Sequence, residues 1–128
     1  MNKLAQLQPN SLWQLFEKIC SIPHPSKHEQ KISAWIQEWA KELGLFIQED
    51  EVGNLLIRKP ATPGMEDRKG VILQAHMDMV PQKNATTEHD FLTDPIKPYI
   101  ITESDGDWVT AEDTTLGADN GIGLASAL

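Results

Sequence analysis

The chain has 128 residues, of which 40% are apolar and 23% are charged, with eight Gly and eight Pro. This length suits about one small domain, and the composition excludes a disordered tail, a collagen-like repeat and a coiled coil. The net charge of −8 at pH 7 disfavours nucleic-acid binding through a basic patch. Apolar runs are only a few residues long, and the first residues lack the apolar segment of a signal peptide. We therefore expect a cytoplasmic protein that does not enter a membrane.

Two helices are predicted in the first third of the chain. Residues 10–22 carry apolar side chains at helical spacing, and Asn10 or Ser11 is expected to cap this first helix. Ser26 and Glu29 have the spacing of a capping box, in which both side chains bind N–H groups of the first turn. The second helix is therefore expected to begin at Ser26.

The periodicity then changes to that of strands. Residues 45–48 and 55–58 predict a hairpin, and residues 99–102 and 108–111 predict two further short strands. Residues 70–75 are nearly all apolar, which favours a strand buried on both faces of a central sheet. Together these elements indicate an α/β fold.

The chain ends within a predicted element. Residues 119–128 predict a helix that is just beginning, with Asp119 or Asn120 as its cap. No capping glycine, proline or terminal base follows to end this helix. We therefore expect the chain to be a fragment of a longer protein.

His76 and Asp78 follow the predicted buried strand directly. Ligands of open α/β sheets collect beyond the carboxyl ends of the strands. Residues two apart in an extended segment point to the same side, so both side chains are expected to face one place. A neutral imidazole binds zinc-like ions, and a neighbouring carboxylate can orient it through its other nitrogen. The simpler alternative is a strand-end histidine paired with a carboxylate, without any metal.

Asp119 lies in a loop of small residues, with Gly117, Gly121 and Gly123 around it. The loop lacks the Lys of a phosphate-binding loop and the spacing of a dinucleotide motif. A crowded carboxylate without a base nearby suits a divalent cation, whereas a plain helix cap is the simpler interpretation.

The acidic stretch before this loop allows two interpretations as well. No Lys or Arg follows Lys97. The acidic residues there are interpreted either as a solvated loop or as ligands of a cation. The remaining candidates are weaker: His24 and His28 are interpreted as surface or capping residues, and His89 as structural. The single cysteine, Cys20, fits a reducing compartment and is interpreted as a buried thiol.

Two stretches carry a specific resemblance. Residues 71–83 (VILQAHMDMVPQK) and 114–123 (TTLGADNGIG) are similar to the aminoacyl-histidine dipeptidases, also called Xaa-His dipeptidases or peptidase D, of the M20 metallopeptidases. Residues 19–26, 52–60 and 91–96 resemble the same proteins. The match covers essentially this whole chain, but only about the first quarter of a typical family member.

The resemblance implies a dinuclear metal site in an α/β/α catalytic domain. His76 then corresponds to a metal ligand, Asp119 to the carboxylate that bridges two ions, and Asp78 to the catalytic-site residue that orients His76. The ions are expected to be Zn, with Co or Mn as alternatives, and the substrate a dipeptide with a C-terminal His. Residues 1–128 would be a partial catalytic domain that is truncated at its C-terminal end.

The implied site is incomplete in this chain. The family's general base is the first of two adjacent glutamates, and no Glu-Glu pair occurs here. We therefore expect this chain to be a fragment of a metal-dependent dipeptidase that is inactive by itself. We also expect the fragment to self-associate through exposed apolar surface. The alternative is a catalytically inactive remnant that serves as a non-enzymatic folded domain.

Overall fold

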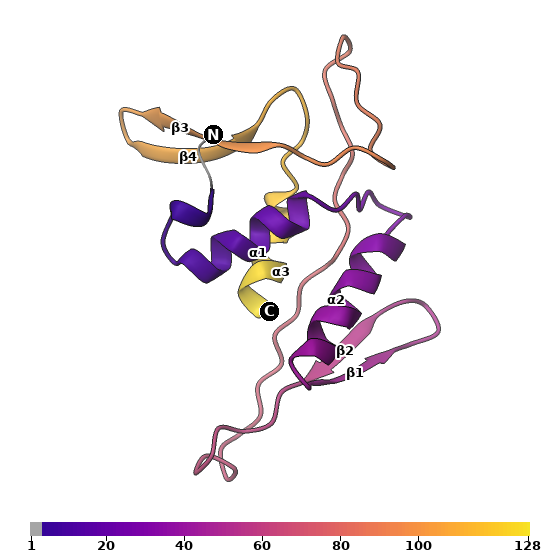
Figure 1. Ribbon diagram of the computed structural model, residues 1–128, viewed down its shortest axis with the longest axis vertical. Helices are drawn as coiled ribbons and strands as arrows, with labels where there is room; N and C mark the ends of the chain where they lie inside the picture. The colour runs from indigo at the N-terminus through magenta and orange to yellow at the C-terminus, as the bar shows by residue number, and fades with distance from the viewer. Residues whose placement is uncertain (1–3) are drawn as a thin grey trace. The chain divides into compact units, whose positions relative to one another are not determined.

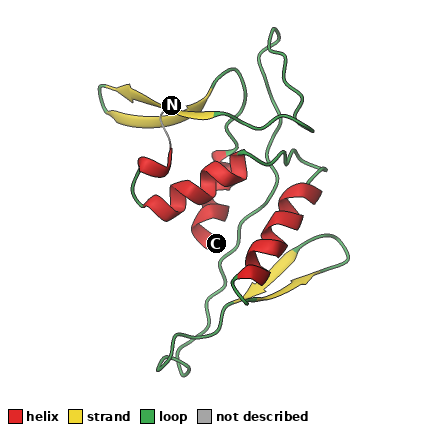
Figure 2. Cartoon of the chain, in the orientation of Figure 1, coloured by secondary structure: helices red, strands yellow, loops and turns green. Residues whose placement is uncertain are grey.

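The structure is a computed structural model that describes residues 4–128. The chain forms two compact units: one contains the residues up to Ile32 together with Gln74–Leu128, and the other contains Ser33–Leu73. Helices and strands occur in both, so the expected mixture of α and β structure is confirmed (Figure 2). Within the described part of the chain, no helix has the length and apolar character needed to cross a membrane.

The larger unit is built around two helices. The helices α1 (Asn10–Cys20) and α3 (Ala118–Ala127) pack against each other, as Figure 1 shows. The short 3₁₀ helix η1 (Leu4–Gln6) contacts α1. The strands β3 (Pro98–Glu103) and β4 (Gly106–Ala111) form the expected antiparallel hairpin, in which Ile100 pairs with Val109.

The core of this unit lies between α1 and α3. The apolar stripe of α1 buries Phe16, Ile19 and Cys20, and α3 contributes Leu124 and Ala125. Burial raises the pKa of the Cys20 thiol to about 12. The prediction of a buried thiol is therefore confirmed.

The expected cap of α1 is wrong. Pro9 precedes the helix in an extended conformation, and no side chain caps the first turn. The Asn10 amide oxygen instead accepts a hydrogen bond from Gln14 Nε2. Pro9 is compatible with this place because its fixed φ and missing N–H cost nothing before a helix.

The expected beginning of the second helix is wrong as well. The helix α2 spans Gln30–Glu42, four residues later than the capping box predicts. Lys27 adopts a positive φ of 77°, which a helical residue cannot have. The Glu29 carboxylate accepts from the N–H of Lys27, while the Ser26 hydroxyl bonds outside the helix altogether.

The smaller unit contains most of α2 and a hairpin of the strands β1 (Phe46–Glu49) and β2 (Leu55–Arg58). The hairpin confirms the prediction. Its turn is held by Asp50, whose carboxylate accepts from the N–H groups of Val52 and Asn54. A hydrogen bond from Gln37 Nε2 to Glu49 Oε2 joins α2 to β1.

The predicted buried strand at residues 70–75 is not formed. The segment is extended but pairs with no described strand, and Val71, Ile72 and Leu73 are 82%, 91% and 67% exposed. A doubly buried strand needs neighbours that accept its backbone hydrogen bonds and cover both faces. The two hairpins pair only within themselves, so they supply no such neighbour among the described residues.

The contact between α1 and α3 can be tested at Gly121. A Cβ atom there would lie 2.9 Å from Phe16 Cε2. We expect Gly121→Ala to lower the free energy of unfolding by about 1–2 kcal/mol, because overpacking outweighs the better helix propensity of Ala. Urea denaturation followed by circular dichroism measures this loss. Gly70→Ala is the control, since its Cβ meets no atom within 4 Å, and equal effects of the two changes would contradict the prediction.

Candidate functional site

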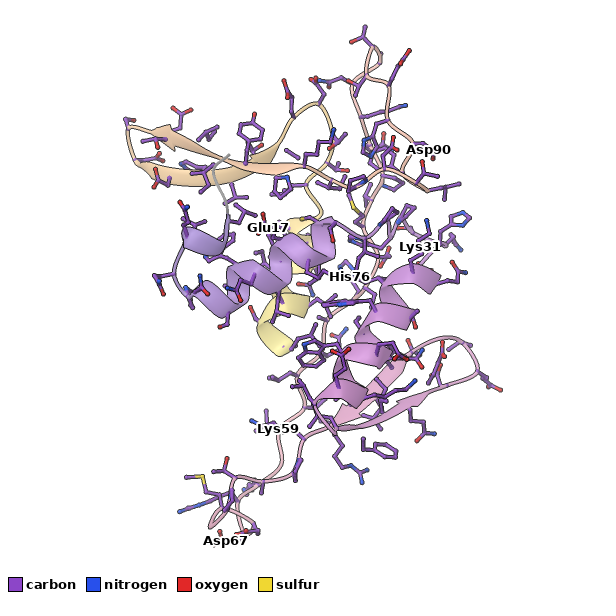
Figure 3. The ribbon with its side chains drawn as sticks, in the orientation of Figure 1. Glu17, Lys31, Lys59, Asp67, His76 and Asp90 are labelled. Carbon is purple, nitrogen blue, oxygen red and sulfur yellow. The ribbon has the colours of Figure 1, made fainter. Side chains whose placement is uncertain are left out.

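Three side chains singled out in the sequence lie together in the larger unit. His76, labelled in Figure 3, places Nε2 3.0 Å from Oδ1 of Asp119. Its Nδ1 lies 3.1 Å from Oδ1 of Asp78 and 3.0 Å from the Asp78 carbonyl oxygen. The imidazole is thus placed between two carboxylates, one at each ring nitrogen.

A short backbone bridge fixes the segment that carries His76 and Asp78. The N–H of Met79 donates to the His24 carbonyl at 3.1 Å, and the N–H of Ser26 donates to the Met79 carbonyl at 3.0 Å. This parallel bridge ties the segment to the loop that follows α1. His76 and Asp78 are therefore anchored although no regular strand contains them.

The loop that carries Asp119 packs on the same segment. Gly117 has a φ of +76°, and a Cβ there would lie 3.1 Å from the sulfur of Met79. Glycine alone fits both the conformation and the space. Gly117 precedes the helix without any side-chain bond, and the two residues expected to cap it, Asp119 and Asn120, lie within its first turn. Asp119 and Asn120 have non-helical backbone angles, and the Asp119 carboxylate faces His76.

Thr115 joins the two site segments directly. Its N–H donates to the Gln82 carbonyl at 2.8 Å, and its hydroxyl donates to the Val80 carbonyl at 2.6 Å. The Thr115 hydroxyl oxygen also accepts from the N–H of Gln82 at 3.2 Å. A second pair of bonds, between Asn84 and Asp113, continues this antiparallel contact. The pairing explains why residues 43 apart in sequence meet at one place.

The charges of the site influence one another. The hydrogen bond with Asp119 raises the pKa of His76, and the nearby charge of Asp78 acts in the same direction. The Ser26 hydroxyl is the main cause that lowers the pKa of Asp78, and His76 adds to it. The Asp119 carboxylate is 96% exposed, so solvent screens its pairing with His76 and the pair adds little to stability.

The donor set fits part of a metal site. Imidazole nitrogen and carboxylate oxygen are ordinary zinc ligands, and two atoms each about 2.0–2.2 Å from one ion lie roughly 3 Å or more apart. The observed 3.0 Å between His76 Nε2 and Asp119 Oδ1 agrees with that separation. Across residues 4–128, however, no three His, Cys, Asp or Glu side chains are arranged to hold an ion by themselves.

The other histidines fall into three different places. His24, which was expected at the surface or as a cap, is buried, and this burial lowers its pKa. His28 is exposed, as expected. The His89 and Phe91 rings meet in an edge-type contact with their centroids 4.5 Å apart. The buried Nε2 of His89 has no hydrogen-bond partner within residues 4–128.

Several acids of the acidic stretch have structural partners. Asp105 accepts from Nε1 of Trp108, and Asp107 accepts from the hydroxyl of Thr102 within the same hairpin. Asp113 accepts from the Asn84 amide. These contacts favour the interpretation of a hydrogen-bonded acidic loop over that of a cation site.

The sequence did not identify Ser26 as a residue of the site, because its spacing from Glu29 indicated a helix cap. In the structure its hydroxyl donates to Oδ2 of Asp78.

Comparison with known proteins identifies relatives along the whole chain. No family model matches the sequence. Over all 128 residues the chain is 64% identical to the cytosol non-specific dipeptidase of Escherichia coli, and it spans 26% of that protein. The crystal structure of aminoacylhistidine dipeptidase from Vibrio alginolyticus matches 98% of this chain with a TM-score of 0.92 and 61% identity. The chain covers 25% of that structure.

A more distant structure shares the fold. A tripeptidase from Staphylococcus aureus matches 94% of the chain with a TM-score of 0.64 and 24% identity, and 30% of that protein is covered.

The matches to the E. coli and Vibrio dipeptidases confirm the resemblance to the aminoacyl-histidine dipeptidases for the part of those proteins that this chain covers. The fold expected from it is that of part of such a peptidase domain, and it is confirmed as well.

Pairing of the two site segments can be tested at Thr115. We expect Thr115→Val to speed hydrogen exchange at the Gln82 and Thr115 amides about fivefold to tenfold, since losing a bond worth about 1 kcal/mol eases local opening. Hydrogen exchange followed by NMR measures the rates. Thr115→Ser retains the hydroxyl and should exchange like the wild type, and exposed Thr86→Val serves as the control. Unchanged rates in Thr115→Val would contradict this role of the hydroxyl.

Proposed function

We propose that the protein to which this chain corresponds is a metal-dependent dipeptidase, and that this chain supplies part of its active site. Hydrolysis of dipeptides is common to the names of the E. coli and Vibrio relatives. Preference for a C-terminal His follows the name of the Vibrio protein and is the finer part of the proposal. The observation that carries the proposal is the approach of His76 Nε2 to Asp119 Oδ1 at 3.0 Å.

His76 and Asp119 are the proposed ligands of a divalent ion, Zn or alternatively Co or Mn. A carboxylate shared by two cations offsets their repulsion, so Asp119 is proposed to bridge a pair of ions. When bound, such ions polarise a scissile carbonyl and lower the pKa of water from 15.7 to about 7. Asp78 holds Nδ1 of His76, which keeps the other ring nitrogen directed toward Asp119.

The chain alone is proposed to be inactive. Catalytic zinc sites use about three protein ligands per ion, and only His76 and Asp119 are proposed here. No Glu-Glu pair is present to supply the general base that the resemblance implies. We therefore propose weak binding of divalent ions by this chain. A non-enzymatic folded domain is the second candidate function. A cytoplasmic location is proposed for both candidates, because the name of the E. coli relative describes a cytosolic protein.

A chimaera tests the proposed function. The matching quarter of the E. coli dipeptidase is replaced by this chain, to which it is 64% identical. We expect the chimaera to release histidine from an Xaa-His dipeptide with Zn²⁺ or Co²⁺. His76→Ala and Asp119→Ala should each lower this activity more than about a hundredfold, because replacing even a residue that only orients a metal ligand lowers activity about 10–100-fold. His28→Ala, at an exposed position, is the control. Full activity in Asp119→Ala, or histidine release by the isolated chain, would refute the assignment.

Self-association is proposed for the isolated chain. Val71, Ile72 and Leu73 expose apolar side chains on an extended segment that no described strand pairs with. Such a segment recruits a second chain through its backbone and its apolar face.

We expect a dimer or larger species at micromolar concentration, measured by sedimentation. Ile72→Lys should shift the population to monomer, because a charge on a pairing edge opposes association. Thr86→Lys adds the same charge at another exposed position and should leave the assembly intact. A monomeric wild type would show that this segment does not associate.

A further inference from the structure

Ser26 makes contacts that neither its predicted role nor the proposed ligands explain. Its hydroxyl donates to Oδ2 of Asp78 at 2.5 Å, across 52 positions of sequence. The Met79 carbonyl is a second, more distant acceptor at 3.2 Å. The site is partly buried, and the backbone bridge between Ser26 and Met79 fixes where the hydroxyl lies.

The bond to Ser26 leaves one oxygen of Asp78 for the imidazole. Oδ2 accepts from Ser26, while Oδ1 lies 3.1 Å from Nδ1 of His76. The terminal torsion of an aspartate is broad, so a carboxylate without such a bond samples many orientations. A fixed Asp78 carboxylate increases the ligand strength of His76 at the opposite nitrogen.

We propose that Ser26 is a positioning residue, whose hydroxyl holds the Asp78 carboxylate against Nδ1 of His76 so that Nε2 is presented to Asp119. The inference deepens the proposed metal site and rests on it for its functional meaning. The link from hydroxyl to carboxylate to imidazole is a property of the chain itself. It can therefore be measured without any metal.

The test is the NMR spectrum of the His76 ring nitrogens in the ¹⁵N-labelled, metal-free chain at one pH. We expect Ser26→Ala to shift both ring resonances, and Ser26→Thr, which keeps a hydroxyl, to restore the wild-type positions. Ser21→Ala is the matched control, because it also removes a hydroxyl that donates to a backbone carbonyl, that of Lys18. Unchanged His76 resonances in Ser26→Ala would overturn the proposal.

A double-mutant cycle separates positioning from a general effect on the fold. If Ser26 acts through Asp78, Ser26→Ala shifts the His76 resonances no further in an Asp78→Asn background. An equal further shift would overturn the proposal. Should the amide spectrum show that Ser26→Ala does not fold, Ser26→Cys replaces it, since the weaker S–H donor should produce a smaller shift in the same direction. No shift in Ser26→Cys would then count against the proposal.

A zinc titration distinguishes this inference from the proposed function. With Zn²⁺ as the probe, we expect Ser26→Ala to raise the dissociation constant about tenfold, as for other residues that orient a metal ligand. If Zn²⁺ leaves His76 unchanged in the wild type while Ser26→Ala still shifts its ring, the positioning role stands and the ligand assignment fails. If Zn²⁺ binds equally well to both chains, Ser26 does not position the ligand.

Discussion

The pairing of Met79 with the loop after α1 is the constraint on which the site depends. Its backbone bonds to His24 and Ser26 on one side, and its buried side chain supports Gly117 on the other. The loop after α1, the extended segment and the residue that precedes α3 therefore meet at Met79. His76 and Asp119 approach each other because their two segments are both attached there, although neither lies in a sheet.

Local features of the sequence predicted local structure well. The two hairpins follow from alternating strands and their turns, and Asp50 completes its turn through bonds to residues within four positions. The apolar stripe of α1 also identified the face that is buried. In these elements the decisive contacts lie within a few residues, so a short window of sequence contains them.

Predictions failed where the decisive partner is remote. Ser26 has the sequence of a helix cap, yet its hydroxyl finds Asp78 far along the chain, and α2 begins only at Gln30. The apolar residues 70–75 have the composition of a buried strand, but burial depends on neighbours that the described residues do not provide. His76 and Asp78 were predicted to face one place from their spacing, whereas the approach of Asp119 depends on the remote bonds of Thr115.

The burial of Cys20 affects how this chain handles soft metal ions. A thiolate is among the strongest ligands for zinc and would compete with imidazole and carboxylate for it. With its pKa raised to about 12, the Cys20 thiol stays protonated at pH 7. The core thus withholds the chain's single thiol from both cations and oxidants. Nitrogen and oxygen donors at the surface meet a divalent ion without that competition.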